Sequence, residues 1–208
     1  IKNYFKIAWR NLIKNRVFTT ANILGLTLAF AIALLLTITV LFELSYDQFH
    51  ENKESVYQVY YTDQTPKGSE LSTANPVPFA PALKDEVPGI KHITRALSEN
   101  VLVSFGENDY NLDAEFVDTD YFSIFSFPTL IGDSAMPMPD QNSVAITEEV
   151  SKKLFGTTNG LGKIVRLQIG KEEKPFTVSG ILKNIPNNSS INFEIAIPFT
   201  THWDYKEY

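Results

Sequence analysis

The stretch ILGLTLAFAIALLLTITVLF, residues 23–42, decides the architecture of this chain. Its twenty residues carry no charge, and the uncharged run reaches back to Val17. As a helix rising about 1.5 Å per residue, the stretch covers roughly 30 Å, the thickness of the hydrocarbon core of a bilayer. Thirteen of the twenty are Leu, Ile, Phe or Val. At roughly −0.3 to −0.6 kcal/mol each, these side chains favour insertion by about 4–8 kcal/mol. The sequence therefore predicts a transmembrane helix over residues 17–44.

The apolar stretch is less typical of a soluble core helix or of a signal peptide. A buried helix in a soluble core needs further apolar segments around it, and no second stretch of the chain is apolar enough to provide them. A cleaved signal peptide has an apolar region of about 7–15 residues followed by a small-x-small cleavage site. The run here is longer and leaves through Phe42, Glu43 and Leu44 without such a site.

The charges on the two sides of the apolar stretch predict its orientation. Residues 1–42 contain five basic residues and no acidic one, whereas the remaining 166 contain 13 basic and 24 acidic residues. Because cytoplasmic flanks are enriched in Lys and Arg, the N-terminus is predicted to lie in the cytoplasm and everything after Phe42 outside. An acidic exterior domain argues against nucleic acid as a partner. The absence of cysteine excludes disulfides and thiolate metal sites.

Residues 1–16 are predicted to form an amphipathic helix on the cytoplasmic face of the membrane. Apolar residues recur there at three- and four-residue spacing, and basic residues step by four along a neighbouring face. Tryptophan suits the level of the lipid headgroups, and cations suit anionic lipid, so membrane lipid is a predicted partner. A disordered basic flank that only sets the topology is the alternative. The predicted membrane-interface residues are Lys2, Lys6, Trp9, Arg10, Lys14 and Arg16.

The rest of the chain, residues 45–208, mixes strand and helix signals. The membrane helix is expected to continue to about His50, and a strand is expected over residues 55–61. Asn75 and Pro76 predict a helix start, and residues 147–156 have a Thr cap, early acids, late lysines and a final Gly. An α+β domain is therefore predicted. Further strands are expected over residues 90–97, 101–105, 110–117, 127–131, 143–146, 163–169, 176–182 and 193–197.

The residues that often carry chemistry form no recognisable site. The three histidines lie far apart, and His50 is expected to be solvated or to cap a helix. The acidic residues of 113–120 lack the calcium-loop pattern. Residues 156–163 fail as a phosphate loop because their glycine spacing is one residue too long and Ile164 replaces the Ser or Thr. The sequence predicts no catalytic residue, no cofactor and no metal.

The chain resembles the MacB-type ABC transporter permeases, a family that includes FtsX-like and lipoprotein-releasing permeases. The resemblance begins with IAWRNLIKNRVFTTANILGLTLAFAIALLL and continues in LSYDQFHENKESVYQVY, just after the apolar stretch. Further along, FVDTDYFSIFSFPTLIGD, SVAITEEVSKKLFGTTNGLGK and FTVSGILKNIPNNSSINFE complete it. These stretches cover nearly the whole chain in the order of the family, and none of them is a catalytic motif.

The resemblance implies a MacB-like periplasmic core domain after the membrane helix, in a bacterial inner-membrane protein. Such a domain consists of a porter-like lobe, about residues 52–105 and 185–208, and an inserted lobe, about residues 106–184. Members carry at least four membrane helices, so the chain is expected to be a fragment truncated at its C-terminus. The implied partners are an ATP-binding subunit and a second permease copy or a paralogue, and the resemblance leaves open whether a periplasmic adaptor joins them.

The resemblance also implies a non-catalytic role, in which ATP hydrolysis by a separate subunit moves the periplasmic domain for export, efflux or signalling. Such mechanotransmission needs a stiff link, and the sequence has no Gly/Pro/Ser linker after the apolar stretch. The alternative is a single-pass sensor or anchored ligand-binding module. The predicted membrane-to-domain coupling residues are Leu44, Tyr46, Asp47, Phe49 and His50.

Overall fold

The computed structural model describes residues 2–66 and 68–202 of the chain. It divides into two compact units, Ile1–Tyr46 and Asp47–Tyr208. Among the described residues, the first unit is helical apart from Asn15 and the turn at residues 44–46, and the second contains strands with a few short helices. The strands and short helices of the second unit confirm the predicted α+β fold class, and this unit is called the α+β domain.

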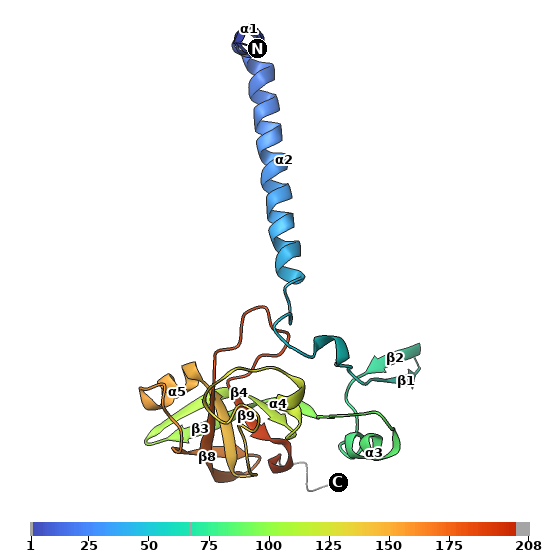
Figure 1. The fold of residues 1–208 in the computed structure, drawn as a ribbon, viewed down its shortest axis with the longest axis vertical. Coiled ribbons are helices and arrows are strands. Elements are labelled where there is room, and N and C mark those ends of the chain that lie inside the picture. The colour runs from blue at the N-terminus through green and yellow to red at the C-terminus, as the bar shows by residue number, and fades with distance from the viewer. Residues whose placement is uncertain (1, 67, 203–208) are drawn as a thin grey trace. The chain divides into compact units, whose positions relative to one another are not determined.

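The first unit consists of α1 (Lys2–Lys14) and α2 (Arg16–Glu43). The two helices are separated at Asn15, whose φ of −106° and ψ of 54° are not helical. Figure 1 shows α1 nearly end-on while α2 lies in the plane of the picture, so α1 runs across the axis of α2. The hydroxyl of Thr19 donates to the carbonyl of Leu12 at 2.9 Å and links the two helices.

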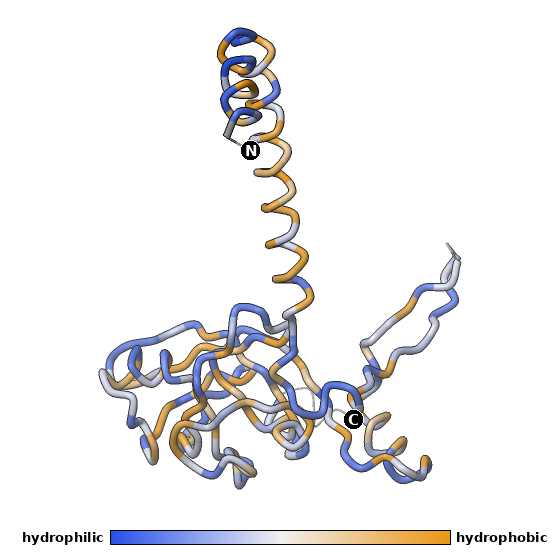
Figure 2. The backbone as a smooth tube through the Cα atoms, turned by 45° about the horizontal axis from the view of Figure 1, so that its top comes forward, coloured by the Kyte–Doolittle hydropathy of each residue, from blue (hydrophilic) through white to orange (hydrophobic). Residues whose placement is uncertain are grey.

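Helix α2 meets the length and composition required to cross a membrane, as the sequence predicted. It has 28 residues, its most apolar window has a mean hydropathy of 2.6, and none of its residues is buried. It is the one such helix in the described part of the chain. Figure 2 shows α2 mostly orange, whereas α1 alternates between blue and orange. The hydroxyls of Thr37 and Thr39 donate to Ala33 and Leu35 carbonyls at 2.8 and 3.0 Å, so these polar groups are satisfied within the helix.

The main sheet of the α+β domain curls into a small closed barrel. Among the described residues, seven strands lie in the order β5-β8-β6-β9-β4-β3-β7, and β7 also pairs with β8. This extra pairing closes the sheet and leaves β5 attached outside the ring along the end of β8. Parallel pairs β4–β9 and β6–β8 occur among antiparallel ones. The strands are β3 (Ala96–Phe105), β4 (Asn108–Val117), β5 (Thr129–Gly132), β6 (Ser143–Thr147), β7 (Ile164–Ile169), β8 (Glu172–Leu182) and β9 (Ile195–Pro198).

Two apolar cores hold the domain together. Alternate residues of the strands fill the barrel, as Val101 and Val103 of β3 or Leu112 and Phe116 of β4 illustrate, because successive strand side chains point to opposite faces. The second core lies on the other face of β4, where Val117 packs with residues of the α4 region. Its buried members are Val117, Tyr121, Phe127, Met138, Ala145, Leu182, Phe193 and Ala196.

The helices of the domain are short. They are α3 (Phe79–Glu86), α4 (Tyr121–Ile124) and α5 (Glu148–Phe155), with one-turn helices η1 (Lys53–Ser55) and η2 (Phe199–Thr201). Helix α5 begins and ends as predicted, because Thr147 accepts a hydrogen bond from the Val150 amide and Gly156 adopts a left-handed φ of 69°. A separate hairpin, β1 (Tyr61–Thr65) and β2 (Gly68–Ser72), lies with α3 to one side of the barrel (Figure 1).

Three predictions about the segment after α2 are wrong. The helix ends at Glu43 instead of continuing to His50, because Asp47 has a positive φ of 56° that a helix does not allow. The strand expected over residues 55–61 starts only at Tyr61, as β1. The helix expected from Asn75 starts at Phe79, because the Asn75 side chain instead donates to the carbonyls of Val59 and Thr73.

The division of the domain into two lobes stays a prediction. Within the described residues, the boundary expected near residue 105 falls in the β3–β4 hairpin, whose ten residue pairs are in continuous register. Strand β9 comes from the expected porter-like lobe and pairs with β4 and β6 of the expected inserted lobe. Strands assigned to both lobes therefore lie in one sheet.

Candidate functional site

Residues 47–52, which follow the apolar helix in sequence, lie against two distant loops of the α+β domain and are called the docking segment. Its first residue, Asp47, donates its amide to the carbonyl of Asn188 at 3.0 Å. The Asp47 carboxylate accepts the Ser190 amide at 2.8 Å and the Ser189 hydroxyl at 3.4 Å. Burial alone would raise the pKa of Asp47, but these hydrogen bonds and nearby His50 outweigh burial and lower it.

His50 occupies the middle of the docking segment and is only 4% exposed. Its Nδ1 accepts the backbone amide of Ser126 at 3.1 Å. Its ring lies 4.0 Å from the ring of Phe49 and 5.4 Å from those of Phe125 and Phe127, measured between centroids. Burial lowers the pKa of His50, and the Asp47 charge opposes this shift. The expectation that His50 is solvated or caps a helix is therefore wrong.

The end of the docking segment is also bonded to the loop that carries Ser126. The Glu51 amide donates to the Ser126 hydroxyl at 3.0 Å, and the Asn52 side chain donates to the Ser123 carbonyl at 3.3 Å. Phe49 is half-buried and joins the second apolar core, with its ring centroid 6.3 Å from that of Phe127. Backbone bonds, side-chain bonds and ring contacts thus fix this short segment to the domain.

The predicted coupling residues divide between the two units. Asp47, Phe49 and His50 all lie in the docking segment and contact the rest of the α+β domain. Leu44 and Tyr46 belong to the first unit, where the Leu44 amide donates to the Val40 carbonyl at 2.9 Å. The ring of Tyr46 meets the ring of Phe42 edge-on at 5.4 Å.

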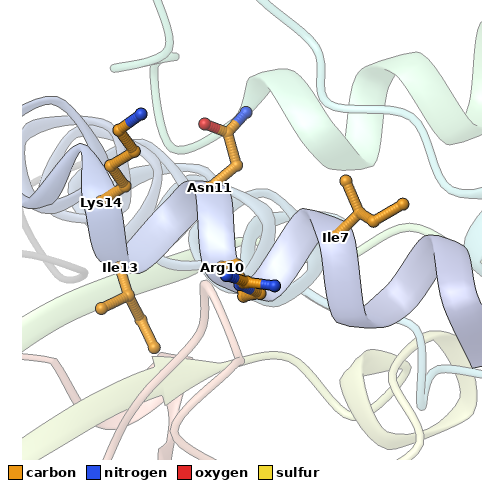
Figure 3. Close-up of a pocket in the computed structure, with 5 residues that line it drawn as sticks. All are labelled: Ile7, Arg10, Asn11, Ile13 and Lys14. Carbon is orange, nitrogen blue, oxygen red and sulfur yellow. The ribbon is translucent and has the colours of Figure 1, made fainter.

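The predicted membrane-interface residues lie on α1 and at the start of α2. Trp9 is 58% exposed, and Lys6, Arg10, Lys14 and Arg16 are exposed as well. The side chain of Lys2 lies outside the described part. Figure 3 shows a shallow depression on α1, with Ile13 pointing away from Asn11 and Lys14. Its lining residues are Ile7, Arg10, Asn11, Ile13 and Lys14.

The loops that receive the docking segment were not predicted from the sequence. Ser126 is 75 to 76 residues away from its partners Glu51 and His50, and Ser190 is 143 residues away from Asp47. A periodic pattern within a short stretch of sequence does not reveal contacts between residues that lie so far apart in the chain. The available signal was indirect, since both loops lie inside stretches that carry the family resemblance.

The acidic residues of the α4 region have structural partners. Asp118 accepts from Arg95 Nη2 at 2.6 Å, and Asp120 accepts from Lys84 Nζ at 2.9 Å. Glu115 is buried and accepts the Ser98 hydroxyl at 2.6 Å, and burial raises its pKa. Within residues 2–66 and 68–202, no group of three or more His, Asp or Glu side chains is arranged to hold a metal ion.

Replacing Asp47 with alanine is expected to loosen the docking segment. A hydrogen bond to a charged group contributes about 1.5–3 kcal/mol, so the segment should open about 10- to 100-fold more often. Alanine also disfavours the positive φ of this position. The measurement is hydrogen exchange of the Ser190 amide at neutral pH.

The matched control is Asp47→Asn, which keeps an acceptor and tolerates a left-handed backbone.

The lowered pKa of Asp47 adds a prediction about pH dependence. The ionised Asp47 carboxylate stabilises the bound docking segment fully above the ordinary Asp pKa of about 3.9. This stabilisation is lost as the pH falls through the lower pKa that Asp47 has in the folded protein. The Asn variant should lack this loss. Equal exchange of Ser190 in wild type and Asp47→Ala would contradict the assigned role.

The architecture defines a class of protein: a helix able to cross a membrane, followed by an α+β domain built on a closed barrel. The chain belongs to the MacB-like periplasmic core domain family, which matches residues 19–207. No curated protein matches the chain.

Solved structures of similar domains include the following three. A domain assigned to a permease protein of Porphyromonas gingivalis is 25% identical with a TM-score of 0.50, covering 58% of this chain and 56% of that chain. The periplasmic region of MacB from Actinobacillus actinomycetemcomitans is 20% identical with a TM-score of 0.45, covering 59% and 54%. The extracellular domain of the noncanonic ABC-type transporter YknZ from Gram-positive bacteria is 22% identical with a TM-score of 0.49, covering 68% and 72%. The match thus spans a little over half of the first two chains.

Proposed function

We propose that this chain is part of a permease subunit of a MacB/FtsX-type ABC transporter, and that it passes movements of the membrane helix to the α+β domain. The observation that carries the proposal is the match to the MacB-like periplasmic core domain family over residues 19–207, in a chain that also has a membrane-length apolar helix. A separate ATP-binding subunit supplies the energy, and this chain itself catalyses no reaction.

The distribution of charge supports an arrangement in the bacterial inner membrane. The basic residues before α2 favour a cytoplasmic N-terminus and therefore support a periplasmic α+β domain. Helix α1 then lies on the cytoplasmic face, where Trp9 sits among headgroups and Lys6, Arg10, Lys14 and Arg16 attract anionic lipid. Lys2 is expected to act with them.

The docking segment supports the proposed transmission of force. Tyr46 donates its amide to the Glu43 carbonyl at 3.2 Å, at the end of α2, and the next residue, Asp47, donates its amide to Asn188 in the α+β domain. Consecutive residues are therefore bonded first to one unit and then to the other. Because one peptide bond joins these two residues, we infer that a displacement of α2 moves the domain instead of being absorbed by a flexible linker.

The proposal is tested with the complete reading frame, tagged and purified from membranes in mild detergent. We expect an ATP-binding protein to co-purify in near-equal amount, together with a second copy or a paralogue of the permease. ATP hydrolysis should then depend on the phosphate-binding lysine of that partner. Replacing that lysine is the control that assigns the hydrolysis to the partner. A chain that purifies alone and shows no hydrolysis would contradict the transporter and favour an anchored ligand-binding module.

A further inference from the structure

We propose that His50 acts as an acid-sensitive latch, whose protonation releases the docking segment from the α+β domain. The inference rests on the proposed function for its consequence, since a released segment would no longer transmit force. The latch itself rests on the geometry around His50 alone, and it is tested separately from transport.

The hydrogen bond at Nδ1 requires the neutral imidazole. Nδ1 accepts the Ser126 amide at 3.1 Å, which assigns the proton of the neutral ring to Nε2. In the imidazolium both ring nitrogens carry protons. The Nδ1 proton would then point at the Ser126 amide proton, and this bond would be lost. Protonation thus converts one of the attachments of the docking segment into a repulsive contact.

The other side of the imidazole offers the charged form no compensating oxygen. Nε2 is buried and has no hydrogen-bond partner among the described residues. The rings of Phe125 and Phe127 meet the imidazole edge-on, at interplanar angles of 64° and 80°. A buried imidazolium with one repelled and one unpaired N–H is costly, whereas an exposed one is solvated by water. Acid therefore favours the state in which His50 leaves its site.

The charges near His50 are few. Asp47, on the docking segment itself, is the group whose charge favours protonation of His50. The neighbouring segment also carries Glu51 and Lys53, both exposed. The α4–β5 loop packed against the ring contributes Phe125, Ser126 and Phe127, and the other receiving loop contributes Asn188, Ser189 and Ser190, none of them ionisable. Burial of His50 thus opposes the charge of Asp47, the acidic group that favours its protonation.

The sign of the pH effect follows from the lowered pKa of His50 in the docked state. Above the ordinary His pKa of about 6.5, the docked and the released states are both neutral, and docking is fully stable. As the pH falls below about 6.5, the released state binds the proton more tightly than the docked state. The released population then rises by up to about tenfold per pH unit until the docked state also titrates. Asp47 does not titrate in this range, because its pKa is lowered too.

The test is hydrogen exchange of the full chain in nanodiscs between pH 7.5 and 5.0, corrected for the intrinsic pH dependence of exchange. We expect the protection of the Ser126 and Glu51 amides to fall by up to about tenfold per pH unit below pH 6.5, with barrel amides unchanged. In His50→Gln the side chain cannot titrate, so protection should not depend on pH. His92→Gln is the matched control, because His92 lies near Asp120 outside the docking segment, and should behave like wild type.

A second measurement covers the case in which His50→Gln fails to fold. Side-chain NMR of the wild-type chain should show His50 titrating below the ordinary His value, together with loss of Ser126 protection. Protection that stays constant across this range in wild type would overturn the latch. Acid release in a chain that neither binds nor stimulates an ATP-binding subunit would instead uphold the latch and remove the proposed transporter.

Discussion

Replacing Phe127 with alanine is expected to lower the free energy of unfolding of the α+β domain by about 3–5 kcal/mol, the range found for large-to-small changes of buried aromatic residues. Phe127 is 7% exposed, and its ring stacks on Tyr121 at 5.8 Å and meets Phe193 edge-on at 5.2 Å. It also lies 5.4 Å from His50, so its removal opens a cavity directly beneath the docking segment. Because a domain of this kind is stable by about 5–15 kcal/mol, the loss is a large fraction of the total.

The measurement is denaturant unfolding of the full chain in detergent, followed by near-UV circular dichroism, which reports the packed aromatic rings rather than the helix content of α2. Tyr57→Ala is the matched control, because Tyr57 is an aromatic residue of the same domain with 83% of its surface exposed. The control should change stability by no more than about 0.5 kcal/mol. Equal losses of unfolding free energy in the two variants would mean that the aromatic core next to the docking segment does not contribute to stability as its burial implies.

The parts of the fold that the sequence predicted depend on local signals. The apolar run of α2 has the length of a membrane span, and this requires no knowledge of other segments. Helix α5 is bounded by Thr147 and Gly156, whose capping roles depend only on neighbouring residues. Strands such as β4 and β7 were predicted within about two residues because β-forming residues are bounded there by turn residues.

The parts that the sequence did not predict depend on contacts between distant residues. The end of α2 is an instructive case, because residues 44–50 contain no glycine or proline that would stop a helix. Asp47 makes three hydrogen bonds to residues 188–190 and has a non-helical φ of 56°, so the helix does not continue through this residue to His50. Closure of the barrel through β7 is equally non-local, since β7 pairs with both β3 and β8.

The candidate site shows the same division. The sequence predicted residues 44–50 as the coupling link, because no flexible linker follows the apolar stretch, and this stays a prediction. The sequence also predicted that the helix continues to about His50, whereas the structure shows a turn in which Asp47 is hydrogen-bonded to the domain. The burial of His50 was missed for the same reason, since it depends on Ser126 and Phe127, far away in the sequence.

If the chain transmits force as proposed, inserting about ten Gly and Ser residues after Tyr46 is expected to uncouple ATP hydrolysis from movement of the α+β domain. A flexible linker of this length has a root-mean-square span of roughly 16–19 Å. It would absorb a displacement of α2 by a few ångströms, because Tyr46 is bonded to the end of the helix and Asp47 to the domain. In the complete transporter, hydrolysis should continue, whereas export and the ATP-dependent change in hydrogen exchange of residues 47–202 should fall to background.

The same insert placed after Gly170 is the matched control. Gly170 lies at the exposed turn between β7 and β8, with a left-handed φ of 60°, and exposed hairpin tips tolerate added residues. This control adds equal length and flexibility to the domain but leaves the link after α2 intact, so export should persist. Export that survives both insertions would show that force does not pass through the docking segment. Loss of export in both would trace the effect to the domain itself. Only loss after Tyr46 with retention after Gly170 identifies the link as the path of transmission, because only that insertion separates the residue bonded to the membrane helix from the residue bonded to the domain.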